Sequence, residues 1–97
     1  MTKKRNRLEI IKDILEVIKN KSGKIKPTHI LYKSNLSHQM MEEYLSELIT
    51  KKFISSSFLS KGRTYSITDK GLEYLNKYRL ISEFTQAFGL NEQIEEQ

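Results

Sequence analysis

Cysteine and histidine, two residue types often used as nucleophiles, bases or metal ligands, are scarce in this sequence. The 97 residues include no cysteine and two histidines, His29 and His38, which fall on different predicted helices. We interpret His29 as a partly buried helix residue, and we expect no bound metal and no cofactor. Serines and carboxylates are present, but no spacing places a nucleophile beside a base, and there is no glycine-rich phosphate loop. The sequence therefore predicts a protein that is not an enzyme.

The polar side chains suited to specific hydrogen bonding lie at the start of a predicted helix that follows Ser37. Ser37 is a good N-cap, and the apolar residues after it recur at three- and four-residue spacing. These apolar residues are Met40, Met41, Tyr44, Leu45, Leu48 and Ile49. The predicted exposed face consists of His38, Gln39, Glu42, Glu43, Ser46 and Glu47. In a helix-turn-helix, the N-terminal residues of the second helix meet base edges in the DNA major groove, so we interpret this stretch as a recognition helix.

Candidate contacts to double-stranded DNA follow from residue type. Ser37, His38 and Gln39 can donate hydrogen bonds to phosphates or base edges, although a plain polar face explains them equally well. Glu42 and Glu43 can accept from cytosine, but phosphates repel carboxylates, so we expect at most one of them to face a base. We include Glu42 in the predicted site.

Basic residues supply the other candidates. Lys61 and Arg63 flank Gly62 in a predicted turn at residues 60–63, where a cation can reach phosphates or a narrow minor groove, or can simply be solvated. The N-terminal cations form either a phosphate-binding arm or a frayed basic end, and two residues at the ends of the short second helix are further candidates. These residues are Lys3, Lys4, Arg5 and Arg7, together with Thr28 and Lys33.

Hydrophobic periodicity predicts the elements that position these residues. A first helix spans about residues 7–21 and ends at Ser22-Gly23, and a second runs from Pro27 to Lys33 after a short strand at 24–26. From residue 53 the period changes to two, which predicts a hairpin of residues 53–59 and 64–68. The order predicts a mainly α fold with a small β-hairpin (α+β), a winged helix-turn-helix domain at residues 1–68. The inward positions of the first helix are Leu8, Ile11, Ile14, Leu15 and Ile18.

A last helix is predicted to begin at Thr68, with Leu72 and Leu75 returning to the core. Beyond them an apolar stripe with heptad-like spacing outruns the small domain, and an exposed stripe of that length indicates a partner. We therefore predict that residues 69–97 form a long C-terminal dimerisation helix, broken near Gly89, and that the protein is a homodimer joined by a coiled coil. The predicted dimer interface is Tyr74, Tyr78, Ile81, Phe84 and Phe88.

The charge distribution favours an anionic partner. The net charge is +5, and residues 1–52 hold 12 Lys and Arg against 6 Asp and Glu, whereas residues 53–97 hold 5 against 6. The basic start continues into a mixed-charge segment rather than an apolar signal core, and no apolar run is long enough to cross a bilayer. We expect a soluble, cytoplasmic protein with no membrane partner.

Three stretches resemble the small archaeal winged-helix DNA-binding proteins, and most closely the chromatin-associated "10a" group of Sulfolobus-like archaea. They are the Leu-Glu-Ile-Ile start at residues 8–11, the Asn-Leu-Ser sequence at 35–37, and the Tyr-x-Ile-Thr-x-Lys-Gly sequence at 65–71. The resemblance covers nearly the whole chain. It implies a DNA-binding homodimer, joined through an antiparallel coiled coil of C-terminal helices. The third helix and the wing, which is the predicted hairpin of residues 53–68, would contact the DNA.

We therefore predict a dimeric transcription regulator or chromatin-associated protein that binds duplex DNA. The alternative is a winged-helix module that mediates protein–protein interaction in the transcription machinery. The acidic residues Glu42, Glu43 and Glu47 favour this alternative. The basic N-terminus and the cations of the wing oppose it.

Overall fold

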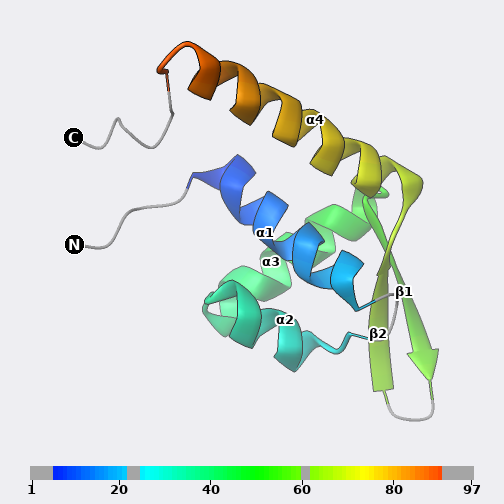
Figure 1. Ribbon diagram of the computed structural model, residues 1–97. Helices are drawn as coiled ribbons and strands as arrows, with labels where there is room; N and C mark the ends of the chain where they lie inside the picture. The colour runs from blue at the N-terminus through cyan, green and yellow to red at the C-terminus, as the bar shows by residue number, and fades with distance from the viewer. Residues whose placement is uncertain (1–5, 22–24, 60–61, 91–97) are drawn as a thin grey trace.

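The computed structural model describes residues 6–21, 25–59 and 62–90, which form four helices and a two-stranded antiparallel sheet (Figure 1). In chain order the elements are α1 (Arg7–Asn20), α2 (Pro27–Ser34), α3 (His38–Thr50), β1 (Ile54–Leu59), β2 (Gly62–Ile67) and α4 (Asp69–Ala87). The architecture is a winged helix-turn-helix with a long C-terminal helix, which confirms the predicted fold class. The proposed helix end at Gly23, the basic arm before residue 6 and the tail after residue 90 lie outside the described residues.

Side-chain caps set where three of the helices begin. Asn6, Ser37 and Thr68 each accept a hydrogen bond from the backbone N–H three residues later, at 2.8, 3.2 and 3.1 Å respectively. The caps at Ser37 and Thr68 were predicted, and the one at Asn6 was not. Helix α2 starts at Pro27 and ends at Ser34. Its C-cap is Asn35, whose φ of 56° is left-handed, a conformation that asparagine tolerates better than most residues.

The core surrounds α1. Ile14, Leu15 and Ile18 have no exposed surface, and α2, α4 and β2 all pack against this helix. The predicted inward position Leu8 is wrong, because it lies in the first turn of α1, and the residue is 56% exposed. The other elements complete the core with a set of buried apolar side chains. These are Ile25, Ile30, Leu36, Met41, Leu45, Leu48, Ile54 and Tyr65.

The second strand of the hairpin begins two residues earlier than predicted, at Gly62, and ends one residue earlier, at Ile67. Its register runs from Ile54↔Ile67 at the base to Leu59↔Gly62 at the far end. Gly62, with a φ of 117°, and Arg63 therefore belong to β2 and not to a turn at residues 60–63. The short strand expected at 24–26 is a single bridge at the described residue Ile25, whose carbonyl accepts from the Tyr65 N–H at 3.1 Å.

Thr68 joins the hairpin to α4. Its hydroxyl lies within hydrogen-bond distance of the carbonyls of Lys52 and Phe53, at 2.7 and 2.9 Å, and its backbone N–H donates to the Phe53 carbonyl at 3.1 Å. The same hydroxyl caps α4 by accepting from the N–H of Gly71, a buried residue. The start of α4 is thus fixed against both strands at the base of the hairpin.

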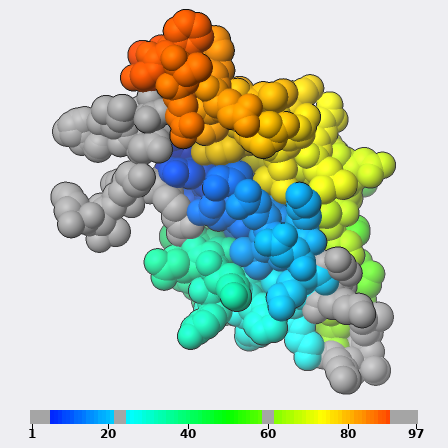
Figure 2. All heavy atoms as spheres, viewed as in Figure 1, coloured from blue at the N-terminus to red at the C-terminus, as the bar shows by residue number. Residues whose placement is uncertain are grey.

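Helix α4 runs antiparallel along α1, and its last turns extend beyond the body of the molecule (Figures 1 and 2). Leu75 packs against the core as predicted, but Leu72 is 41% exposed, so that prediction is wrong. Gly71 takes the buried position in the first turn instead, and Leu72 points about 100° further around the helix. None of the helices among the described residues is long and apolar enough to cross a membrane.

We predict that Gly71→Ala destabilises the protein. A Cβ at this position would lie 2.6 Å from Ile67 Cγ1 and even closer to the Phe53 carbonyl oxygen, so the start of α4 has to move away from the hairpin. The expected loss is about 1–3 kcal/mol of unfolding free energy, measured by urea denaturation. Glu73→Ala, which removes the exposed ion pair between Glu73 and Lys77 two residues further along the helix, should change stability by less than about 0.5 kcal/mol. Equal effects from the two variants would contradict the proposed close packing.

Candidate functional site

The predicted recognition residues come together at the exposed start of α3. Ser37, His38, Gln39 and Glu42 are all exposed, and the Ser37 hydroxyl already serves as the cap acceptor for Met40. The imidazole Nε2 of His38 lies 3.8 Å from a Glu42 carboxylate oxygen, close enough for an ion pair when the histidine is protonated. This end of α3 therefore presents hydrogen-bonding groups that its own chain leaves open to solvent.

The outward face of α3 extends further than the predicted site. Gln39, Glu43, Ser46 and Thr50 are all exposed, and their spacing of four, three and four residues places them on one side of the helix. Ser46 and Thr50 were not predicted as site residues, although the helical period contained that signal. Met40, predicted to be on the apolar side, is 38% exposed because the buried stripe consists of Met41, Leu45 and Leu48.

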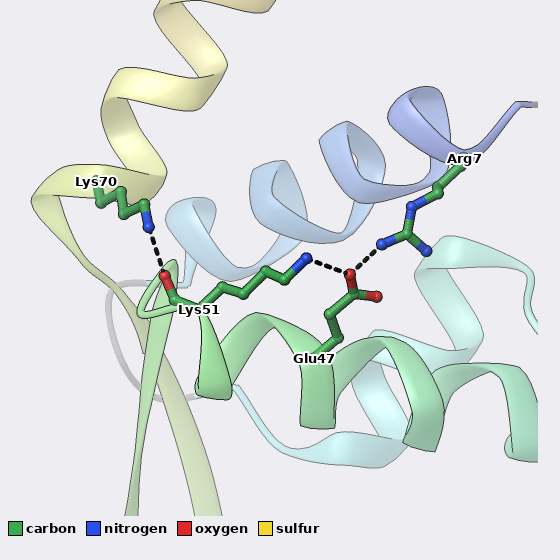
Figure 3. A network of polar contacts seen from close by, with 4 residues as sticks. All are labelled: Arg7, Glu47, Lys51 and Lys70. Carbon is green, nitrogen blue, oxygen red and sulfur yellow. Dashed lines mark hydrogen bonds and ion pairs between the residues drawn. The ribbon is translucent and has the colours of Figure 1, made fainter.

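Glu47 has a different role from the other acidic residues of α3. Its carboxylate accepts hydrogen bonds from the Arg7 guanidinium of α1 and, at 3.0 Å, from the Lys51 ammonium (Figure 3). The Arg7 guanidinium also lies 5.7 Å from the centre of the Tyr44 ring, and Lys70 donates to the Lys51 carbonyl at 2.8 Å. Arg7 and Lys51 thus compensate the charge of Glu47, the carboxylate in the C-terminal half of α3.

This network shifts the acid–base behaviour of its members. The hydrogen bonds from Lys51 and Arg7 hold the pKa of Glu47 below its ordinary value, and the hydrogen bond to Glu47 raises the pKa of Arg7. Arg7 was predicted as a DNA contact, and the structure places it in this ion pair with 54% of its side chain exposed. Its exposed surface leaves it able to approach an anion as well.

The candidates on α2 are exposed too. Thr28 and Lys33 lie on the surface at its two ends. His29, interpreted as partly buried, is exposed instead, because Ile30 is the α2 residue that fills the core. Tyr32 is 81% exposed and was not predicted as part of any site. The described residues contain no group of three or more histidine, cysteine or acidic side chains able to hold a metal ion.

On the wing, Arg63 is exposed and its guanidinium carbon lies 4.7 Å from the centre of the Phe58 ring. Phe58 is 73% exposed and is the partner of Arg63 across the hairpin. Sequence reasoning did not predict a role for Phe58. Of the remaining predicted contacts, Lys3, Lys4, Arg5 and Lys61 fall outside the described residues.

The predicted dimer residues divide into two groups. Tyr74 and Tyr78 belong to their own chain: the Tyr74 hydroxyl donates to the Leu8 carbonyl at 2.8 Å, burial raises its pKa, and its ring stacks on Tyr78 at 6.2 Å. The more distal residues of the stripe are uncovered, and their exposures range from 59% to 65%. These are Ile81 (60%), Phe84 (59%) and Phe88 (65%).

A groove of about 390 Å³ runs along the surface where α4 packs against α1, and no described residue of α3 or the hairpin lines it. It contains the cations Lys12, Lys19 and Arg79 together with the acids Glu16 and Glu83. Both signs of charge are therefore interspersed, and this surface has no consistent charge with which to attract a polyanion.

Comparison with known proteins agrees with this architecture. Residues 4–86 match the family model described as winged helix-turn-helix, and the chain belongs to that family. Its fold is similar to that of Sso10a-2, a DNA-binding protein from Sulfolobus solfataricus, with a TM-score of 0.75 over 95% of each chain and 22% identity. This match confirms the predicted resemblance to small archaeal winged-helix proteins.

The sequence is also similar to that of an uncharacterised protein from Methanocaldococcus jannaschii. The two are 34% identical over an alignment of 82 residues, and the alignment covers 80% of this chain. The chain spans only 36% of the length of that relative.

We predict that Glu47→Gln destabilises the protein at pH 7 and has a smaller effect in acid. Because the folded state lowers the pKa of Glu47 below its ordinary value of 4.5, the ionised carboxylate stabilises the fold above that pH. The contribution is lost as the pH falls through the folded-state pKa. The gap between the urea midpoints of wild type and variant should therefore narrow from pH 7 to pH 3. A gap of the same size at both pH values would show that the ion pair does not stabilise the fold.

Proposed function

We propose that the protein binds duplex DNA, with α3 in the major groove and the wing against the neighbouring backbone or minor groove. The observation that carries this proposal is the uncovered outward face of α3, which offers Gln39, Ser46 and Thr50 to solvent. A helix fits the major groove, and amide and hydroxyl groups can hydrogen-bond to base edges and phosphates there. The description of the structurally similar Sso10a-2 as a DNA-binding protein supports the same function.

The charges on and around α3 determine how such binding would work. Glu42 and Glu43 remain exposed on the helix, so phosphates must approach elsewhere. Glu47 is compensated by Arg7 and Lys51, which removes one source of repulsion. In this proposal, cations around the helix and on the wing supply affinity by neutralising phosphates, and base readout is limited to a few polar side chains.

We further propose that two chains associate through the distal half of α4. Ile81, Phe84 and Phe88 are each more than half exposed on an element that projects from the molecule (Figure 2). A second copy of the same helix would bury these side chains, and each would contribute roughly 1–2 kcal/mol when removed from water. A dimer with two DNA-binding surfaces suits either a transcription regulator or a chromatin-associated protein.

The exposed carboxylates of α3 favour a second candidate function, a module that binds a basic protein surface. Glu42 and Glu43 would then be contact residues and the wing cations would be uninvolved. The following experiment separates the two functions.

Reversing the wing charges by Lys61→Glu with Arg63→Glu should weaken binding to random duplex DNA by roughly tenfold or more. Because two phosphate contacts are lost, the slope of log affinity against log salt should also fall in magnitude by roughly two. Gel shifts at two salt concentrations measure both quantities. The matched control is Lys19→Glu with Arg79→Glu, which makes the same charge change in the groove between α1 and α4 and should weaken binding much less. Equal losses for both pairs, or none, would contradict a DNA-binding wing.

Ile81→Glu with Phe84→Glu should convert the protein to a folded monomer, because charged side chains cannot be buried unpaired between two copies of α4. Sedimentation equilibrium measures the mass, and circular dichroism checks the fold. Gln86→Glu adds a charge on another side of the same helical turns and should leave the mass unchanged. A wild-type protein that sediments as a monomer would rule out this dimer.

A further inference from the structure

The end of the wing carries an aromatic ring that its own chain leaves largely uncovered. Side chains on a strand alternate between faces, so Phe58 lies on the same face of β1 as the core residue Ile54. Phe58 is 73% exposed, whereas Ile54 is 2% exposed. The face of the hairpin that carries the core residues Ile54 and Tyr65 therefore ends in solvent at Phe58.

Arg63 differs from the other arginines that the structure describes. Arg7 and Arg79 each pair with a carboxylate, Glu47 and Glu83 respectively. The Arg63 guanidinium instead lies over the Phe58 ring at 4.7 Å, within the range of a cation–π interaction. The pairing of these two residues across the hairpin places their side chains next to each other. The wing thus presents a charge that is held in place and not neutralised by an acid among the described residues.

We propose that Phe58 and Arg63 act together as a minor-groove probe that prefers A·T base pairs. This inference rests on the proposed DNA-binding function and adds a specificity to it. Narrow A·T minor grooves have an enhanced negative potential that attracts arginine, and their floor lacks the guanine N2 amino group. The walls of the groove are deoxyribose sugars, which offer an apolar surface to the exposed Phe58 ring.

The stacked pair fits a groove better than it fits an exposed phosphate. A cation that contacts only a phosphate needs no aromatic support and would leave the Phe58 ring in water. Inside the groove the ring is covered and the guanidinium reaches the floor in an orientation already set by the ring. Holding the side chain in advance lowers the entropy cost of binding.

Three duplexes of equal length test the proposal: one of A·T pairs, one of G·C pairs and one in which inosine replaces every guanine. Inosine removes the N2 amino group from the minor groove but keeps the major-groove edge of guanine. The wild-type protein should bind the A·T and inosine duplexes more tightly than the G·C duplex, by roughly fivefold, as measured by fluorescence anisotropy.

Phe58→Ala and Arg63→Lys should each reduce this preference to about twofold or less, because the first removes the support and the second keeps the charge without the planar guanidinium. Ser57→Ala, at the neighbouring exposed position of β1, should keep the wild-type preference. Thermal unfolding checks that each variant is folded.

Several results would overturn the proposal. If the inosine duplex binds like the G·C duplex, or if Phe58→Ala keeps the wild-type preference, the pair does not read the minor groove. If Phe58→Ala changes the sedimenting mass, the ring belongs to a contact between chains. Each of these three results leaves the proposed duplex binding intact, whereas a wild-type protein that binds none of the three duplexes contradicts the proposed function as well.

Discussion

The burial of α1 is the constraint on which the rest of the structure depends. Ile14, Leu15 and Ile18 are completely enclosed, and α2, α4 and β2 each pack against that helix. Each such side chain contributes roughly 1.5–3 kcal/mol when it leaves water, a large share of the marginal stability of a small domain. Because α1 organises a single core, α3 and the hairpin lie around it with one face buried. Their other face, which has the proposed binding role, remains exposed to solvent.

Electrostatic compensation decides how an acidic α3 can serve the proposed function. Three carboxylates on a helix near phosphates would oppose binding, but they are not equivalent. Glu47 is paired with Arg7 and Lys51, so the half of α3 nearest the wing carries a network of both signs. Glu42 and Glu43 lie closer to the start of the helix and remain exposed. The repulsion that a phosphate meets therefore depends on the net charge around the part of α3 that it approaches, and not on the number of acidic residues in the whole helix.

The sequence predicted most of the fold because the signals were local. The caps at Ser37 and Thr68 follow from chemistry within one turn, and the change of period after α3 predicted the hairpin. The error at Leu72 arose because the buried position in the first turn of α4 is Gly71, a residue that hydrophobic periodicity does not count as apolar. The stacking of Arg63 on Phe58 depends on the cross-strand register, which no local pattern specifies. The predicted roles of the α3 and wing residues in DNA binding stay predictions.

The bonds made by Thr68 have a consequence for the geometry of a two-chain assembly. One residue connects the start of β1, the end of β2 and the first turn of α4, so the tail helix cannot swivel on a loose linker. Two chains joined through their α4 helices would form a rigid assembly that holds their two α3 surfaces at a fixed distance from each other. Its ability to bridge two segments of a polymer would then depend on their separation and phase as much as on their chemistry.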